Sequence, residues 1–479
     1  MRVYKIFIFI LGIIVLLGLL CVFFPKNGIS IGEKRLFFPT VEDIMHPEIH
    51  SNAKDKLDAL EAGLRMDFVM DSVAQAKQSA YNDSLSFYTN FFENHPARFH
   101  LPNNDYSFFN DLFYSIDKSL KNNEIIHILH YGDSQIEADR ITGLIRQKFQ
   151  EQFGGNGPGL IPAIQLIPTP AVSQTASGNM KRYTIAGSHT RAAEHNRYGI
   201  LGQTVEIYGE GTINVSSRNQ KSTFENAKEF STVRVFVSRN SPDFSVSLQT
   251  GNDEPIVKTI QDERIIPSTL TWKFKNPIRK FVMNFSGYAE ISAISLDGNA
   301  GVAVDNIPLR GSSGTFFTSI DVKTLVPVLE ELNVKLIIME YGGNRMPSIK
   351  SSKAIIDYTK SIAKQINFFN EIYPAAKILF IGPSDMAKMH DGRLQTYPYL
   401  KETVQGIKET ALENGAAFWN MFEVMGGENS MIEWVRNSPP WASPDYIHFS
   451  HIGSNKIAEM FYESLMIYYN YTDYVNNPQ

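Results

Sequence analysis

The chain has 479 residues and a formal net charge of −5; apolar residues make up 43% of it and charged residues 20%. This composition can bury large cores, excludes a disordered chain, and at this length suggests two or three domains. Because Lys and Arg form no long stripe in the sequence, nucleic acid is excluded as the expected partner.

The first predicted element is a membrane anchor in residues 1–25. The uncharged apolar run from Ile6 to Phe24 is long enough to cross a hydrocarbon core of about 30 Å. No small-residue cleavage motif follows the run, so we expect a retained anchor, with a cleaved signal peptide as the alternative. Arg2 and Lys5 precede the run, which predicts a single-pass protein of the cell membrane with its bulk outside the cytoplasm, in the periplasm.

Cys21 is the only cysteine, and it lies within this run. A disulfide within the chain and a cysteine-based metal site are therefore excluded. Lipid attachment at Cys21 is the weaker alternative to a plain anchor, because Leu20 is not the small residue that such a cleavage site needs.

Residues 26–104 are predicted to form a juxtamembrane, partly helical region. Apolar residues recur at spacings of three and four between about 52 and 93, which is typical of helices. The stretch ENHPARFHLPNND then breaks the pattern, as a linker does. We interpret the helical part as a stalk or packing appendage.

A strand is predicted over Ile125–Leu129, followed by the corner HYGDSQIE and a helix to about Phe153. The corner has two readings: Ser134 is an ordinary helix N-cap, or a nucleophile held beside the positive end of a helix dipole. The tripeptide Gly-Asp-Ser alone does not decide between them. The later GGNGPGL lacks the Gly-Lys-Ser/Thr ending of a phosphate loop and predicts a tight turn.

Between about 170 and 305 the sequence changes to short segments with period-two alternation, such as STVRVFVS and AEISAISLDG, which predicts a β-sandwich or jelly roll. From 306 onward strands alternate with helices again, as in VKLIIMEYGGN and KILFIGPSD. We therefore expect an α/β domain with a parallel sheet, built from residues 105–165 and 306–473 and interrupted by an inserted β domain, 166–305. Its ligands are expected at the carboxyl ends of the strands.

Four separate stretches carry the parts that acyl transfer by a serine requires. Ser134 supplies a hydroxyl, and His448 can remove its proton. Asp445, three residues earlier, can hold the other ring nitrogen of that histidine. The backbone amides of Ser134 and Gly314 and the side-chain amide of Asn344 can stabilise an oxyanion, and glycine suits a close approach of backbone to substrate.

The order Gly-Asp-Ser, Ser-Gly-Thr, Gly-x-Asn and Asp-x-x-His resembles the SGNH hydrolase superfamily, also called GDSL esterases. The resemblance implies a three-layer, flavodoxin-like fold in which Ser134 is the nucleophile, Gly314 and Asn344 are oxyanion donors, and Asp445 and His448 complete the triad. A β domain between the serine and glycine blocks is similar to the layout of peptidoglycan O-acetylesterases, where it looks like a carbohydrate-binding module. The C-terminal stretch also resembles related peptidoglycan O-acetyltransferases.

Several residues have a competing interpretation. Gly311 competes with Gly314 for the oxyanion role, and His451 competes with His448 although it lacks an Asp three residues earlier. Asp133 is expected to be a structural turn residue rather than a catalytic acid.

Other polar and aromatic residues are expected to be structural. His127 and His130 are read as packing residues rather than as a metal pair. Aromatic residues of the insert are expected in its core more often than on a sugar platform: Tyr208, Phe236, Trp272, Phe274 and Phe281. For Trp434 and Trp441, a sugar-binding rim and loop packing both stay open.

The sequence thus predicts a serine esterase that removes acyl groups, foremost O-acetyl, from an envelope carbohydrate and needs no metal or cofactor. Its expected partners are the membrane and an acetylated glycan, with peptidoglycan among the candidates. One alternative is an O-acetyltransferase that receives acetyl from a membrane-bound partner and passes it to a glycan. The other is a non-catalytic glycan-binding envelope protein.

Overall fold

The computed structural model describes residues 11–13, 16–20, 22–25, 29–31, 34–36, 74–187, 191–264, 266–390 and 392–476; for 29–31, 34–36 and 74–83 it describes the backbone only. A large part of the predicted anchor, including residues 1–10, lies outside these ranges, as do residues 52–73 of the predicted stalk. None of the helices in the described ranges combines the length and apolar character that crossing a membrane requires. In the juxtamembrane region, β1 (Ile29–Ile31) pairs with β2 (Lys34–Leu36), and α4 covers Ala74–Asn94.

The central sheet has the strand order β13–β4–β14–β15–β18–β3. Its strands are β3 (Phe99–His100), β4 (Ile125–Gly132), β13 (Gly301–Pro308), β14 (Val334–Glu340), β15 (Lys377–Ile381) and β18 (Ala417–Trp419). All neighbours are parallel except the short edge strand β3. Numbered along the chain, the five parallel strands lie in the order 2-1-3-4-5 of a flavodoxin-like sheet, and its switch point falls between β4 and β14. The predicted parallel α/β fold is confirmed.

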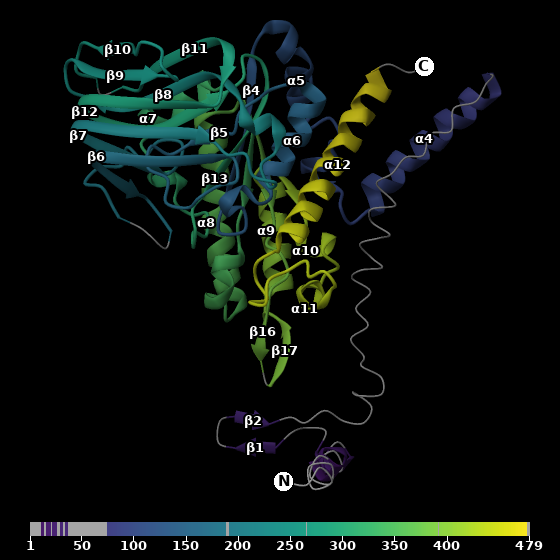
Figure 1. Ribbon diagram of the computed structural model, residues 1–479. Coiled ribbons are helices and arrows are strands. Elements are labelled where there is room, and N and C mark those ends of the chain that lie inside the picture. The colour runs from purple at the N-terminus through teal and green to yellow at the C-terminus, as the bar shows by residue number, and fades with distance from the viewer. Residues whose placement is uncertain are drawn as a thin grey trace.

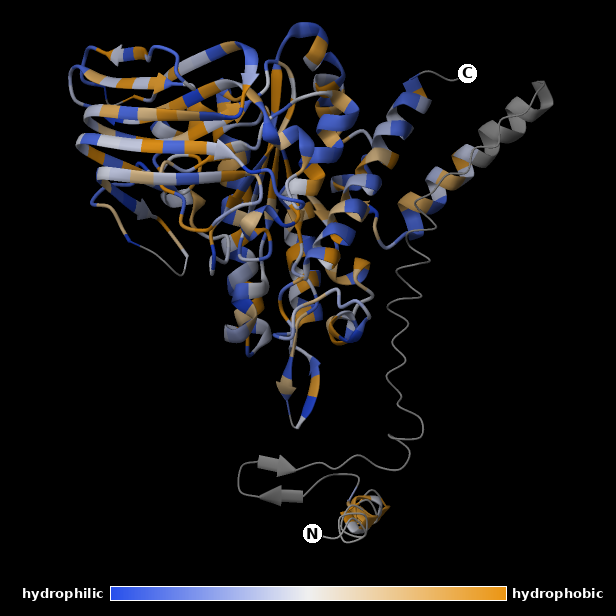
Figure 2. Cartoon of the chain, in the orientation of Figure 1, coloured by the Kyte–Doolittle hydropathy of each residue, from blue (hydrophilic) through white to orange (hydrophobic). Residues whose placement is uncertain are grey.

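Helices cover both faces of this sheet. One core cluster joins Ile126 and Ile128 of β4 to α5 (Asn110–Asn122), α6 (Thr142–Phe153) and α12 (His451–Asn476). A second cluster joins Leu129 and Tyr131 to α7 (Val322–Glu331), α8 (Ser352–Ile372) and α9 (Leu400–Glu413). Because side chains alternate along a strand, burial on both faces requires the nearly continuous apolar run that β4 has. Figures 1 and 2 show the apolar strands between the two helical layers.

Smaller elements complete this domain. α4 packs along α12 through aromatic pairs such as Phe92 with Tyr468, whose ring centroids lie 4.6 Å apart. Near the carboxyl ends of the strands lie the hairpin of β16 (Ala387–His390) and β17 (Arg393–Thr396) and the short helices α10 (Met421–Val424) and α11 (Ser430–Arg436) (Figure 1). Single 3-10 turns cover Pro102–Asn104 (η1), Glu137–Asp139 (η2), Glu225–Lys228 (η3), Phe317–Ser319 (η4) and Gly343–Ser348 (η5).

The insert is all-β, as predicted, and antiparallel. Its strands are β5 (Gly159–Ile161), β6 (Val172–Thr184), β7 (Gln203–Ser217), β8 (Phe230–Asn240), β9 (Phe244–Gln249), β10 (Ile256–Ile260), β11 (Ser268–Ile278) and β12 (Lys280–Asp297). The first half of β12 lies between β7 and β9, and its second half lies between β5 and β8. Strands from both halves enclose one apolar core that includes Val205, Val235, Val246 and Phe285.

The change from one sheet to the other comes earlier along the chain than the predicted boundaries near 166 and 306. β5 already pairs with β12 of the insert, and β13 begins at Gly301 and pairs with β4 over its whole length. A boundary at 305/306 would therefore cut β13.

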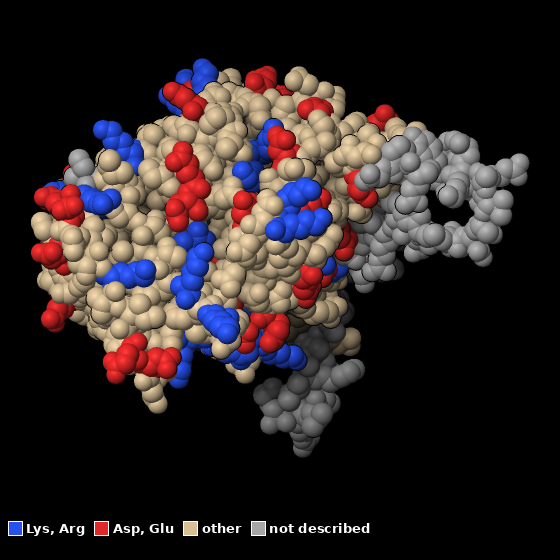
Figure 3. Space-filling view, turned by 90° about the horizontal axis from the view of Figure 1, so that it is seen from above, with Lys and Arg blue, Asp and Glu red and all other residues tan. Residues whose placement is uncertain are grey.

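The two domains also meet through buried charges. Asp305 on β13 accepts hydrogen bonds from the backbone amide of Leu160 (2.7 Å) and pairs with His127 Nδ1 (2.7 Å). Arg234 of β8 contacts His127 Nε2 at 3.3 Å and Asp297 at 2.9 Å. His127 is therefore a packing residue at the domain junction, as the sequence predicts. On the described part of the face in Figure 3, basic and acidic side chains are interspersed without a continuous basic stripe.

Candidate active site

Ser134, His448 and Asp445 form a continuous hydrogen-bonded chain. Ser134 follows the carboxyl end of β4, whereas Asp445 and His448 lie in the loop before α12. Ser134 Oγ lies 2.8 Å from His448 Nε2, and His448 Nδ1 lies 2.7 Å from Asp445 Oδ2. When Asp445 accepts the Nδ1 proton, Nε2 is left as the acceptor for the serine hydroxyl.

Asp445 is held as an acceptor by its own loop. Its Oδ1 accepts the backbone N–H groups of Ile447 and His448, each at 3.0 Å. Partial burial acts to raise the pKa of Asp445, but the hydrogen bonds from His448 and Ile447 outweigh it and lower the pKa. The carboxylate is therefore ionised at neutral pH, as a group that orients a histidine must be. His451, the competing base, lies one turn on in α12 and is exposed.

Asn344 lies in η5, directly after β14, and faces the same cavity as Ser134. Asn344 Nδ2 donates to Asp133 Oδ2 at 2.7 Å and to the carbonyl of Ser312 at 3.1 Å. Both of its N–H groups are thus engaged, and one of them must be shared with or released to an oxyanion if Asn344 is to stabilise it.

Gly314 lies on the other side of Ser312. Its amide donates to Ser312 Oγ at 3.2 Å, and its φ is +74°. A Cβ at this position would lie 2.5 Å from the ring of Tyr341, so only glycine fits. Gly311, the competing residue, is exposed. The oxyanion role of Gly314 stays a prediction.

The cavity at these residues has a volume of about 140 Å³. Its lining includes Ser134, Asn344 and His448, together with Gln135, Pro347 and Met386, and does not include Gly314. It has room for a small acyl group. The structure thus brings Ser134, Asn344, His448 and Asp445 together, whereas Gly314 lies outside the lining of the cavity.

Asp133 does more than terminate β4. Its carboxyl group is buried and accepts hydrogen bonds from the backbone amide of Gln135 (2.9 Å) and from Asn344. Burial, together with the nearby charges of Glu340 and Glu137, raises the pKa of Asp133 to about 7 against the opposing effect of these hydrogen bonds. Asp133 is thus a structural residue, as predicted, and its hydrogen bond holds the side chain of Asn344 in place.

Gln135 is a site residue that the sequence reading missed. Its Nε2 donates to the carbonyl of Ile447 at 2.8 Å and to Ser384 Oγ at 3.1 Å, and its Oε1 accepts from the amide of Phe449 at 3.4 Å. The side chain therefore hydrogen-bonds to the backbone of both residues that flank His448, Ile447 and Phe449. Its only signal in the sequence is its place directly after Ser134.

Two more side chains join the loops around the site. Arg310 forms an ion pair with Glu137, which ties the loop after Ser134 to the loop before Gly314. His130 lies buried at 3.1 Å from Glu340, behind the cavity, consistent with a packing role. Trp434 and Trp441 are buried against each other with ring centroids 5.5 Å apart, so they pack the loop that carries the histidine.

The aromatic residues of the insert divide as expected, with one exception. Phe236, Trp272 and Phe281 are buried, and Phe274 packs partly against the core of the insert. Tyr208 is instead 39% exposed.

Comparison with known proteins supports the fold. No protein-family model and no curated protein sequence matches the chain. A solved structure of a peptidoglycan O-acetylesterase matches with a TM-score of 0.61 and 20% identity over 76% of this chain and 96% of that one. The matched 76% of the chain is longer than the α/β domain alone, so the likeness extends into the insert.

Two further matches are more distant. A family two carbohydrate esterase from Cellvibrio japonicus matches with a TM-score of 0.25 and 8% identity over 63% of this chain and 99% of that one. A GDSL-like lipase from Parabacteroides merdae matches with a TM-score of 0.25 and 16% identity over 35% and 74%. The first match shows that the chain shares its fold with a peptidoglycan O-acetylesterase, the kind of protein whose layout the sequence resembles.

Proposed function

We propose that the chain is a serine esterase of the SGNH type that removes O-acetyl groups from an envelope carbohydrate. One observation carries the proposal: the Ser134–His448–Asp445 hydrogen bonds are formed at the edge of a cavity that has room for a small acyl group, beside the amide of Asn344. The shared fold with a peptidoglycan O-acetylesterase supports it.

The reaction follows from this geometry. Ser134 Oγ attacks the ester carbonyl while His448 Nε2 takes the hydroxyl proton, and Asp445 stabilises the resulting imidazolium. Asn344 and the amide of Ser134 stabilise the oxyanion of the tetrahedral intermediate, and Gly314 joins them when its amide leaves Ser312 Oγ. Collapse of the intermediate expels the sugar alkoxide, which receives the proton from His448. Water, activated by the same ring, then hydrolyses the acyl-enzyme and releases acetate.

Solvent access favours hydrolysis over transfer. The side chain of His448 is 29% exposed and that of Asp445 is 46% exposed, so water can reach the acyl-enzyme from the side of the histidine. An O-acetyltransferase remains the alternative and needs a sugar hydroxyl to outcompete that water. A non-catalytic glycan-binding protein is the second alternative, and the formed hydrogen-bond chain argues against it.

The proposal extends to location and glycan binding. The apolar run from Ile6 to Phe24 and the preceding Arg2 and Lys5 support a single-pass anchor with the esterase outside the cytoplasm. The insert is proposed to be a β-sandwich module that holds the glycan, because the match to a peptidoglycan O-acetylesterase covers 76% of the chain, more than the α/β domain alone.

The test is acetate release by the full chain from a chromogenic acetyl ester and from acetylated cell-wall glycan. Ser134→Ala and His448→Ala should abolish release, whereas His451→Ala, the matched control, should retain it. A fluorophosphonate probe should label the parent chain and not Ser134→Ala. Acetyl transfer to an added glycan acceptor in place of acetate release would favour the transferase. No release and no labelling of the parent chain would rule out both enzymes.

A further inference from the structure

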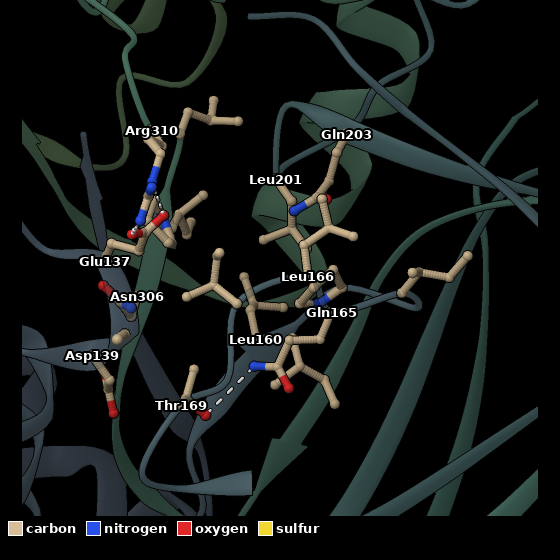
Figure 4. A pocket seen from close by; sticks show the side chains of 18 of the residues that line it. Glu137, Asp139, Leu160, Gln165, Leu166, Thr169, Leu201, Gln203, Asn306 and Arg310 are labelled. Carbon is tan, nitrogen blue, oxygen red and sulfur yellow. Dashed lines mark hydrogen bonds and ion pairs between the residues drawn. The ribbon is translucent and has the colours of Figure 1, made fainter. Parts of the chain in front are cut away.

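A second cavity lies between the insert and the α/β domain, on the other side of the loop that carries Ser134. Its volume is about 110 Å³. Its walls are mainly apolar, with Leu160, Leu166 and Leu201 facing the space in Figure 4. Glu137 and Arg310 close the side toward the α/β domain, and Gln203 faces them from the insert.

The charges in the α/β wall of this cavity neutralise one another. Arg310 pairs with Glu137, with Nε 2.9 Å from Oε1. Arg146 pairs with Asp139 through two hydrogen bonds of 2.7 and 2.9 Å. Neither pair offers a net charge to a ligand.

Arg182 is different. It lies on β6 on the same face as Met180, which packs against the core of the insert, so its side chain points inward. Its Nε donates a hydrogen bond to Gln203 Oε1 at 2.7 Å, and no carboxylate pairs with it among the residues that the structure describes. Burial lowers the pKa of Arg182. A partly buried guanidinium without a counter-charge is costly, and a carboxylate ligand would offset that cost.

The cavity also borders the site. Glu137 lies three residues after Ser134, and Arg310 lies four residues before Gly314. Ala138 and Asp139, which line the cavity, hold left-handed backbone angles, with φ of +59° and +62°. Residues other than glycine rarely adopt these angles, and such strain gathers where backbone serves a binding site.

We propose that this cavity is an anion subsite that takes a carboxylate on a short apolar carbon chain, with Arg182 as its cation and Gln203 as its neighbouring amide. This inference rests on the proposed function, because it assigns the carboxylate to the glycan whose ester Ser134 attacks. A hexuronic acid and a lactyl or short peptide substituent share this chemistry.

Binding is tested first, independently of turnover. Lactate is titrated into the full chain, and the leucine methyl resonances of Leu160 and Leu201 are followed by NMR. Saturable shifts are expected in the parent chain and in Lys181→Gln, whose changed side chain lies on the opposite face of β6. The shifts should be lost in Arg182→Gln and weakened in Leu166→Trp, a substitution at an exposed position that narrows the cavity. Equal shifts with neutral lactamide, or undiminished lactate binding by Arg182→Gln, would overturn the assignment.

Turnover then identifies the carrier. Arg182→Gln should raise KM about tenfold for the acetylated glycan that bears the carboxylate, the expected cost of one charge-assisted hydrogen bond, and leave the chromogenic acetyl ester unaffected. Two substrates are compared, an acetylated uronic-acid polymer and an acetylated peptidoglycan fragment. The substrate whose KM rises in Arg182→Gln is the one whose carboxylate binds at Arg182. Unchanged KM in both arms would overturn the glycan assignment. Failure of the parent to cleave the chromogenic ester would instead count against the esterase and leave the lactate result standing.

Discussion

The two cavities of this molecule are built in opposite ways. The one at Ser134 is lined by short loops at the carboxyl ends of parallel strands, and its polar groups hydrogen-bond to one another. The one between the domains is lined by strand and loop residues, mainly with apolar side chains, and Arg182 lacks a carboxylate partner among the described residues. We propose a reaction for the first and a ligand for the second. Variants in the first should therefore leave lactate binding unchanged, and variants in the second should leave turnover of the chromogenic ester unchanged.

The largest effect is expected from Asp445→Asn. The amide cannot stabilise the imidazolium and favours the wrong tautomer of His448, so kcat/KM for the chromogenic acetyl ester should fall by about 10³–10⁴. Lactate shifts at Leu160 should be identical to those of the parent chain. Loss of both readouts would show that the two cavities are not independent.

Asn344→Ala should lower kcat by about 10²–10³, the usual cost of removing one oxyanion donor. The comparison variant is Asn367→Ala, which removes an exposed amide that bonds to Asn414 on the far side of α8. Steady-state kinetics with the same ester distinguish the two. Full activity in Asn344→Ala would mean that its N–H groups never leave Asp133 and Ser312.

Gln135→Glu tests whether the side chain of Gln135 positions His448. The substitution keeps an acceptor for the amide of Phe449 and replaces the donor to Ile447 with a charge, which should displace His448. We expect kcat to fall by about 10²-fold with KM for the small ester unchanged, since a displacement of about 1 Å is sufficient. Gln147→Glu, at a glutamine of α6, serves as the control. A rise in KM with normal kcat would contradict a positioning role.

The smallest effect concerns stability. The pKa of Asp133 is raised to about 7 in the folded chain, so the folded state holds a proton that the unfolded state releases near pH 4. Its stabilising contribution is complete below that lower pH and is lost as the pH rises through 7. Asp133→Asn removes this dependence, and the difference in Tm between variant and parent should shift in favour of the variant from pH 4 to pH 8. A pH-independent difference would contradict the raised pKa.

Part of the candidate site could be predicted from the sequence because Ser134 and Asn344 lie in loops that follow apolar strands, and parallel strands bring their carboxyl ends to one edge. Asp445 and His448 lie in the loop before α12, and their spacing of three residues was their signal. Gln135 could not be assigned because its partners are backbone groups at the other end of the chain. No local pattern records such a contact.

The insert, by contrast, has features that the sequence could not predict. Arg182 lies in VSQTASGNMKRYT, a polar strand without alternation, so neither its inward orientation nor its lack of a counter-charge could be inferred. The boundary near 306 was misplaced because GVAVDNIP resembles the antiparallel strands before it, and only the register with β4 shows that β13 is parallel. Partner choice between strands is a tertiary property that a single sequence leaves open.

The base of the insert bears on how the chain folds. β4 and β13 are neighbours in the sheet although the whole insert separates them in sequence, and such a non-local pairing is normally slow to form. Backbone hydrogen bonds from Val302 to Gly154 (3.0 Å) and from Gly298 to Asn156 (2.8 Å) hold the two ends of the insert together, as does the pairing of β5 with β12. Once the insert has folded, its two ends are held close together, so pairing β13 with β4 carries no further entropic cost of closing the loop that the insert forms. β13 can then pair with β4 as if the segment between them were short.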